Sequence, residues 1–320
     1  MKCVVTGAAG FIGSHLCERL LGDGHEVVAV DCFTDYYPRA IKEANAAELR
    51  ADPRCAFLEE DVLEVDFGSL LDGVEVVFHQ AAQAGVRASW GSEFDVYVRC
   101  NILATQRLLE AAKGSSLRKI VYASSSSVYG NVDQMPISEE TLPRPVSPYG
   151  VTKLAAEELC YLYWSNYGVP TISLRYFTVY GPRQRPDMAM HKFIRAILND
   201  EPLIVYGDGE QSRDFTFVSD VVEANIAAAE ADAAGEALNI AGGSVTTVNE
   251  VIRALERILG KRARVEYESP AKGDVRQTQA TPTRARELLG YEPRVSLDEG
   301  LRQEVEWYMA SRHLLDNVAV

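Results

Sequence analysis

The 320-residue sequence predicts an α/β protein: a doubly wound parallel sheet with a smaller, interleaved C-terminal lobe. Short apolar runs alternate with amphipathic stretches through the first half, which is the pattern of strands covered by helices on both faces. Beyond about residue 176 the loops lengthen, and short strands precede helices such as 248–260. We therefore expect one domain over residues 1–175 and a second lobe over 176–320, partly interleaved with the first.

Five buried strands are predicted from runs that are rich in Val, Ile and Ala, at 2–7, 26–31, 74–82, 119–125 and 170–176. Helices are predicted from the amphipathic stretches between them, at 12–24, 41–52, 100–114 and 148–168. Several of these stretches end with glycine, the usual residue at a helix C-terminus.

The composition limits the partners of this chain. Its formal charge of −14 argues against nucleic acids and anionic membranes, because both need a basic surface. An acidic protein can still bind an anionic small molecule through a local cluster of Arg and Lys. With 47% hydrophobic residues, the chain has enough apolar side chains for a sizeable core.

The cysteines and the termini bear on the cellular setting. The six cysteines form no CxxC pair and follow no metal-ligand spacing, so we expect free thiols, no metal and a cytoplasmic location. The N-terminus runs straight into a strand and a glycine loop, which leaves no room for a signal peptide. No apolar run approaches the length of a membrane span.

The loop after the first strand, TGAAGFIGSH, predicts a dinucleotide site of the Rossmann type. Gly7 allows the tight turn, Gly10 lets the backbone approach a pyrophosphate, and Gly13 lets helix and strand pack closely. The helix start, with Phe11 and Ile12, offers free N–H groups and the positive end of the helix dipole to the phosphates.

Residues at later strand ends complete the predicted cofactor site. Asp31 ends the second strand, where a carboxylate accepts both ribose hydroxyls but repels a 2′-phosphate; this favours NAD over NADP. Asp61 and Val62 fall where a third strand would end beside the adenine, although Asp61 could equally be a solvated carboxylate. Ala81 and Ala82 are small enough to leave room for the cofactor.

Tyr149 and Lys153 lie one turn apart at the start of the helix predicted over 148–168. An ammonium beside a phenol favours the phenolate, lowers the tyrosine pKa and makes it a usable base. An ordinary surface pair would have the same spacing, so the rest of the chain has to decide.

The ordered motifs TGAAGFIGSH, SSVYG, SPYGVTK, RYFTVYGP, RDFTFVSDVV and LLGYEPRVSLDEGL decide it. Over almost its whole length the chain resembles the extended short-chain dehydrogenase/reductase superfamily, and within it the NAD-dependent nucleotide-sugar epimerases and dehydratases. The resemblance implies that Tyr149 takes a proton from the sugar C4 hydroxyl and that Lys153 binds the nicotinamide ribose. It also assigns Ser125 to the proton relay, with Ser126 as the competing candidate, and Tyr176 to the cofactor.

The serine run also bears on the outcome of the reaction. Dehydratases of the family resemble one another in an Asp-Glu pair where this chain has Ser126 and Ser127, and the decarboxylases that make UDP-xylose carry Glu at the position of Ser127. Without an acid for elimination, the resemblance implies epimerisation: hydride leaves C4 for NAD and returns to the opposite face of the 4-keto sugar.

The sugar is inferred from the stretch RYFTVYGPRQRPD. Thr178 in place of the usual Asn, together with Arg185, resembles the UDP-glucuronate 4-epimerases, in which Thr and Arg hold the C6 carboxylate. An Arg fork suits a carboxylate. The loop that carries Arg87 is similar to the same subgroup, and Lys192 could add positive charge. A solvated loop arginine remains the alternative for Arg87 and Arg185.

The resemblance places the nucleotide among later residues. Val205 and Tyr206 correspond to the strand beside the uracil, and Arg213 corresponds to a diphosphate contact. Asp274 and Arg276 are further nucleotide contacts by resemblance, although Lys272 stands in this loop where the family usually has Arg.

Three other functions remain open: a UDP-glucose/UDP-galactose 4-epimerase, a UDP-glucuronate decarboxylase, and an NAD-binding sensor without turnover. The main prediction is conversion of UDP-glucuronate to UDP-galacturonate. A homodimer is expected through the helices near residues 100–113 and 148–167, because family members usually pair through these helices.

Overall fold

A computed structural model describes residues 1–315 and shows an α/β fold with three sheets. The largest sheet has seven strands in the order β10-β6-β5-β4-β1-β2-β3, and every neighbouring pair is parallel. Its strands are β1 (Lys2–Thr6), β2 (Glu26–Val30), β3 (Cys55–Leu58), β4 (Val76–His79), β5 (Lys119–Ser125), β6 (Thr171–Tyr176) and β10 (Glu236–Ile240). The predicted fold class is therefore confirmed.

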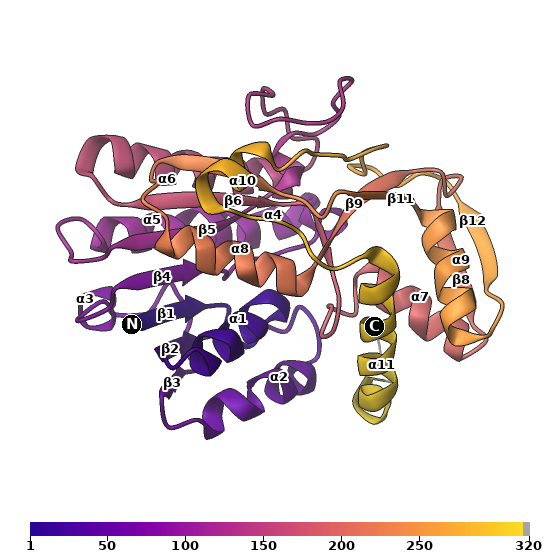
Figure 1. Ribbon diagram of the computed structural model, residues 1–320, viewed down its shortest axis with the longest axis horizontal. Coiled ribbons are helices and arrows are strands. Elements are labelled where there is room, and N and C mark those ends of the chain that lie inside the picture. Colours follow the sequence, from indigo (N-terminus) through magenta and orange to yellow (C-terminus); the bar gives the residue numbers. More distant parts are fainter. Residues whose placement is uncertain (316–320) are drawn as a thin grey trace.

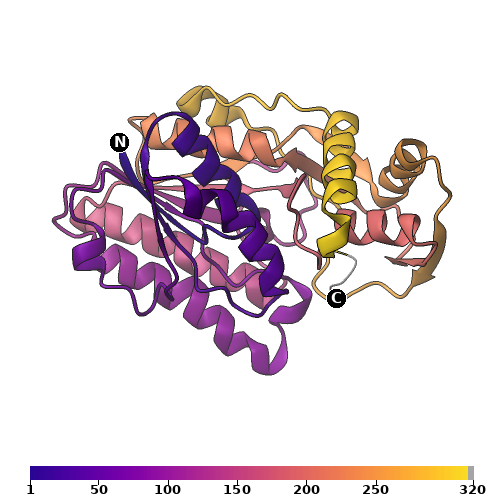
Figure 2. The ribbon, with the colours of Figure 1, turned by 90° about the horizontal axis from the view of Figure 1, so that it is seen from below.

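Helices cover both faces of this sheet (Figures 1 and 2). One face packs on α1 (Phe11–Gly22), α2 (Arg39–Ala51) and α8 (Val218–Glu230), and the other on α3 (Phe67–Leu70), α5 (Ala104–Ala111) and α6 (Pro148–Tyr167). The alternation of β1 shows the reason: Cys3 and Val5 join the first core, whereas Val4 joins the second. Because both faces are buried, the strands read as continuous apolar runs.

The second lobe contains the two small sheets and lies beside the first (Figure 1). Its elements are β7 (Thr178–Tyr180), α7 (Ala189–Leu198), β8 (Pro202–Tyr206), β9 (Ser212–Phe217), β11 (Ser244–Thr247), α9 (Val248–Leu259) and β12 (Arg264–Glu268). α11 (Leu297–Leu315) stands at the junction of the lobes (Figure 2). α8, β10 and α10 (Thr283–Leu289) return from the later sequence to the large sheet, so the chain interleaves there.

The segment before α5 is not regular α-helix. Short turns at Arg87–Ser89 and Gly91–Glu93 lead into α4 (Phe94–Tyr97), and a π-helical stretch, Val98–Leu103, follows. The periodicity predicted a single helix over 100–114. The structure confirms a helix there, but its first turns, Val98–Leu103, are π-helical. Such widened turns are frequent at functional sites.

Local sequence signals set several helix ends. The Ser147 side chain caps α6 by accepting from the Gly150 N–H at 3.1 Å, and Pro148 occupies the first turn, where no N–H is needed. Gly168 ends α6 in the left-handed conformation, with φ of 70°. Thr247 and Glu250 form a capping box at the start of α9.

No helix within residues 1–315 is long and apolar enough to cross a membrane. Over the same range no group of three or more His, Cys, Asp or Glu residues could hold a metal ion. The six cysteines are free thiols.

Candidate active site

The glycine loop forms a tight turn that places the start of α1 against the end of β1. Gly7 has φ of 70°, and its carbonyl accepts from the Gly10 N–H at 3.0 Å. A Cβ on Gly13 would lie 2.1 Å from that carbonyl oxygen, so only glycine allows this approach. Gly10 is the N-cap of α1 and contributes no side-chain cap, which leaves the helix N-terminus open to phosphate, beside Phe11 and Ile12.

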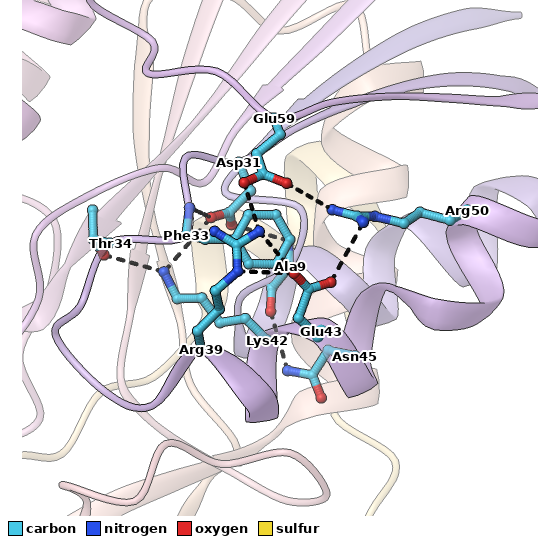
Figure 3. Close-up of polar contacts among 10 residues, drawn as sticks. All are labelled: Ala9, Asp31, Phe33, Thr34, Arg39, Lys42, Glu43, Asn45, Arg50 and Glu59. Atoms are coloured by element: carbon cyan, nitrogen blue, oxygen red, sulfur yellow. Dashed lines mark hydrogen bonds and ion pairs between the residues drawn. The ribbon is translucent and has the colours of Figure 1, made fainter.

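Asp31 lies at the end of β2 and holds the glycine loop in place (Figure 3). Its carboxylate accepts from the Ala9 N–H at 3.0 Å and from the Phe33 N–H at 2.8 Å. Lys42 of α2 approaches the same carboxylate at 3.6 Å, and both side chains are buried. Sequence analysis missed Lys42. Its place on the helix after the second strand is the only signal that could have suggested it.

A rim of exposed charges borders this corner (Figure 3). The Arg39 and Arg50 guanidinium groups lie 4.5 and 5.2 Å from the Phe33 ring centroid, and the Glu59 carboxylate accepts from both. These groups are 40–50% exposed, so solvent screens them far more than it screens the Asp31–Lys42 pair.

The remaining predicted cofactor residues line the carboxyl ends of the neighbouring strands. Ala81 approaches the glycine turn so closely that a Cβ on Gly7 would lie 2.8 Å from its nitrogen. Asp61 accepts from the Leu63 N–H at 2.8 Å and Val62 is buried, whereas Ala82 is exposed. The Tyr176 hydroxyl donates to Asn225 at 3.0 Å in the interior.

These features fit a dinucleotide. A glycine cradle, an uncapped helix N-terminus and a carboxylate at the end of β2 are the three parts that hold a pyrophosphate and a ribose. The residues that would hold NAD are therefore those of the glycine loop, Asp31 and the strand ends around it.

The candidate base lies on the first turn of α6. Burial raises the pKa of Tyr149, while a hydrogen bond from Ser125 and the charge of Arg185 lower it. This contact singles out Ser125 from the serine run, since it is the serine that meets the phenol. The backbone N–H of Ser127 donates to the same Ser125 hydroxyl at 3.2 Å.

Lys153 behaves differently from the expectation. Its ammonium lies 4.6 Å from the Tyr122 ring centroid, its side chain is buried, and burial lowers its pKa to about 7. The contributions that lower the Tyr149 pKa come from Ser125 and Arg185, and burial outweighs them. The protein alone therefore does not produce the acidic phenol that the spacing suggested.

A buried hydrogen-bond chain that sequence analysis missed supports this turn. Asn101, in the π-helical stretch, donates to the Thr152 hydroxyl at 2.9 Å and exchanges two bonds with the Gln83 backbone, at 2.8 and 3.0 Å. Thr152 in turn donates to the Tyr149 carbonyl at 2.9 Å. Asn101 therefore ties the candidate cofactor loop to the candidate catalytic helix. Only the π-helical start of the helix could have pointed to Asn101, and such a stretch has no sequence periodicity by which to predict it.

The C-terminal lobe brings Arg185 to the same site, already paired. The Arg185 guanidinium donates to Asp187 through Nε at 2.9 Å and Nη2 at 3.0 Å. Tyr36, from the loop after β2, donates to the same carboxylate at 3.2 Å. Thr178 begins β7 nearby in sequence and is half-buried.

Four predicted substrate contacts gather at the mouth of the site. Arg87 donates to Asp274 at 2.7 Å and stacks over the Tyr206 ring, 4.1 Å from its centroid. Burial lowers the pKa of Arg213, while the charge of Asp274 raises it, so these groups are neighbours.

The side chains of the other predicted substrate residues do not join this group. The Arg276 carbonyl accepts from Arg213 at 3.5 Å, but the Arg276 guanidinium pairs with exposed Asp208, at 2.8 Å. Val205 is buried in the core and can offer a ligand only its backbone, and Lys192 is exposed on α7.

Comparisons with known proteins agree with this arrangement. Residues 3–241 match the model of the NAD dependent epimerase/dehydratase family. A UDP-glucuronate 4-epimerase of Thermodesulfobacterium geofontis is 39% identical over 325 residues, covering 99% of each chain. The structure of a UDP-glucuronic acid 4-epimerase from Bacillus cereus with UDP-glucuronic acid and NAD has a TM-score of 0.94 at 46% identity, covering 97% of this chain and 99% of that one.

A third similar protein, MoeE5, has been solved with two sugars. Its complex with UDP-glucose and NAD has a TM-score of 0.88 at 44% identity, covering 98% of this chain and 100% of that one. Its complex with UDP-glucuronic acid and NAD has the same TM-score at 45% identity, covering 97% and 100%.

Proposed function

The chain belongs to the NAD-dependent epimerase/dehydratase family, and from this premise we propose that it converts UDP-glucuronate to UDP-galacturonate by epimerisation at C4. One observation carries the proposal: the Tyr149 phenol is hydrogen-bonded to Ser125 and lies close enough to the Arg185 guanidinium for that charge to lower its pKa. A base for a sugar hydroxyl and a cation for a sugar carboxylate thus face one site.

In the proposed reaction Tyr149 removes the C4 hydroxyl proton, and Ser125 holds the same hydroxyl. Bound NAD supplies the hydride acceptor and returns the hydride. Lys153 would hold the nicotinamide ribose. Its buried ammonium, together with the positive charge of the oxidised nicotinamide, would favour the phenolate form of Tyr149. The phenol then gives its proton back after the sugar presents its other face.

The serine run offers no acid at the two positions that dehydratases and decarboxylases use. Ser126 and Ser127 occupy the positions where dehydratases and decarboxylases carry acids, and a serine cannot serve as an acid near neutral pH. Epimerisation remains because it needs no group beyond the base that started the reaction.

We assign Arg185 and Thr178 to the sugar carboxylate, and Ser126 and Ser127 to the sugar hydroxyls. Arg87 and Arg213 supply positive charge for the diphosphate, an otherwise unfavourable partner for a protein of charge −14. The Val205 backbone and Tyr206 border the uracil.

We assign Lys192 and Arg276 to outer contacts with the nucleotide, and Asp274 to the ion pair that positions Arg87 beside it. All three residues are exposed.

We also propose a homodimer in the cytoplasm, formed through α5 and α6. Large apolar side chains on the outer face of α6 support this proposal, since they would otherwise remain in water. Their exposed fractions are 53% for Tyr161, 49% for Leu162, 36% for Trp164 and 61% for Tyr167.

The test is to incubate the protein separately with UDP-glucuronate and UDP-glucose and to resolve the products. Formation of UDP-galacturonate is expected from the first. Deuterium placed at C4 of the sugar should appear on the bound dinucleotide when turnover is stopped. Carbon dioxide release, or label that never leaves the sugar, would overturn the proposal.

A further inference from the structure

Arg185 meets its substrate with a counterion already in place. Both guanidinium nitrogens of its Nε–Nη2 edge donate to the two oxygens of Asp187, at 2.9 and 3.0 Å. The Tyr36 hydroxyl donates to Oδ2 of the same carboxylate at 3.2 Å, and the Arg185 guanidinium carbon lies 5.9 Å from the Tyr36 ring centroid. Such a bidentate pair fixes the position of the guanidinium plane.

The pair is held from both lobes of the protein. Arg185 and Asp187 follow β7, whereas Tyr36 belongs to the loop after β2. A Cβ on Gly85 would lie 2.2 Å from the Tyr36 hydroxyl oxygen, so the loop before Arg87 closes tightly over this contact. The side chains of Arg185 and Asp187 are only 20% and 30% exposed. The contact is therefore built into the site and does not belong to its surface.

The charge of Asp187 persists at neutral pH. Burial alone would raise the pKa of this carboxyl, but the Arg185 charge and the hydrogen bonds from Arg185 and Tyr36 hold it below its ordinary value. The Arg185–Asp187 pair is consequently neutral as a unit, and only the Nη1 side of the guanidinium remains for a sugar carboxylate.

We propose that Asp187, anchored by Tyr36, is the counterion that lets this one site turn over neutral UDP-hexoses as well as UDP-hexuronates. The proposal rests on the function given above and extends its substrate class. A buried guanidinium without a partner is costly, so a site with a bare Arg185 would reject a sugar that lacks a carboxylate. With Asp187 present, a neutral sugar leaves no cation unpaired.

The same arrangement weakens the preference for the acidic sugar. The Nε and Nη2 groups of Arg185 already donate to Asp187, so an incoming sugar carboxylate finds fewer free donors. It is also repelled by the negative charge of Asp187. The complexes of MoeE5 with both UDP-glucose and UDP-glucuronic acid show that a similar protein binds both kinds of sugar.

The test compares kcat/KM for UDP-glucuronate and UDP-glucose in the wild type, Asp187→Asn and Tyr36→Phe. The wild type should epimerise both sugars. Asp187→Asn should raise the ratio in favour of UDP-glucuronate at least tenfold, mainly by losing activity on UDP-glucose, because Arg185 then needs the substrate carboxylate. Tyr36→Phe should shift the ratio in the same direction by a smaller factor. Asp52→Asn is the matched control, since Asp52 makes the same two-bonded contact with Arg54 on the surface; its ratio should not change.

Equal losses on both sugars in Asp187→Asn and in Tyr36→Phe would overturn the proposal, because a merely structural residue would have that effect. A wild type that epimerises UDP-glucuronate but never UDP-glucose would also overturn it. Arg185→Leu separates this inference from the proposed function. If Arg185→Leu loses more kcat/KM on UDP-glucuronate than on UDP-glucose, Arg185 binds the sugar carboxylate, whatever the result for Asp187→Asn. Equal losses on the two sugars would show that Arg185 does not bind the carboxylate, and both the proposed function and this inference would fail.

Discussion

The two halves of the site hold their charges in opposite ways. In the cofactor half Asp31 is 7% exposed and bonded to backbone N–H groups of the loop that it supports. In the substrate half Arg87 and Asp274 pair with side chains 50% and 33% exposed, and Arg276 and Asp208 pair at 66% and 56%. Buried contacts to the backbone are complete before any ligand binds, whereas exposed ion pairs can exchange one partner for another at low cost.

The difference indicates which half is preorganised. The cofactor half presents its final geometry, because its glycines and carboxylate are fixed by close packing. Apart from the more buried Arg185–Asp187 pair, the substrate half holds its positive charge in exposed ion pairs that a diphosphate would have to displace or share. The candidate catalytic turn of α6, where Tyr149 meets Ser125 and lies near Arg185, should show the largest effects of mutation.

Tyr149→Phe should leave NAD and UDP-sugar binding intact and lower turnover by about 10³-fold, the usual contribution of a general acid or base. Binding is measured by titration and turnover by product analysis. Tyr267→Phe, at an exposed tyrosine on β12, is the control and should act like the wild type. Turnover of Tyr149→Phe close to that of the wild type would remove the phenol from the mechanism.

Lys153→Met should change the pH dependence of stability. The folded pKa of Lys153 is about 7, and the unfolded value is about 10.4. Below pH 7 Lys153 is charged in both the folded and the unfolded state, and the buried charge destabilises the folded state. As the pH rises above 7 the folded protein releases the proton first, so the wild type gains about 2–4 kcal/mol by pH 10.

The variant should lack this gain, which unfolding of the cofactor-free protein at pH 6 and pH 9 would measure. The exposed Lys261→Met is the control and should retain the gain. A variant with the pH slope of the wild type would show that Lys153 is charged in the fold throughout this range.

Asp31→Asn tests the preorganised half. Asparagine can still accept from the Ala9 N–H, but it cannot bind ribose hydroxyls as an anion; NAD affinity should therefore fall about 10- to 100-fold. NADP should gain relative to NAD, because Lys42 loses its anionic partner, keeps only its bond to the Thr34 hydroxyl, and can face a 2′-phosphate. Glu59→Gln on the exposed rim is the control and should leave both affinities unchanged. Unchanged NADP binding in Asp31→Asn would mean that Lys42 does not reach the ribose.

Asp274→Asn tests the exchangeable half and should have the smallest effect. It frees Arg87 and removes a negative charge near the diphosphate, so the KM for the UDP-sugar should fall by up to about fivefold, which corresponds to about 1 kcal/mol. Stability should change by less than about 1 kcal/mol. Asp298→Asn, in an exposed pair with Arg302, is the control for both. A raised KM would instead mean that Asp274 itself holds the nucleotide, as its sequence position suggests.

The sequence by itself determined the features that depend on neighbours along the chain. Short, continuous apolar runs between amphipathic stretches predicted five of the seven strands of the large sheet, because a strand buried on both faces is apolar along its whole length. The glycine loop, Asp31 and the spacing of Tyr149 and Lys153 were readable for the same reason: each is a local pattern whose geometry follows from one turn or one strand end.

Only the tertiary structure decided the contacts between distant segments. It brings the Ser125 hydroxyl to the Tyr149 phenol and joins both Arg185 and Tyr36 to Asp187. It also makes burial, and not Lys153, the largest influence on the Tyr149 pKa. Tyr36 and Asp187 are 151 positions apart in the chain. No periodicity records such a meeting, because the free energy of a side chain depends on what packs around it in space.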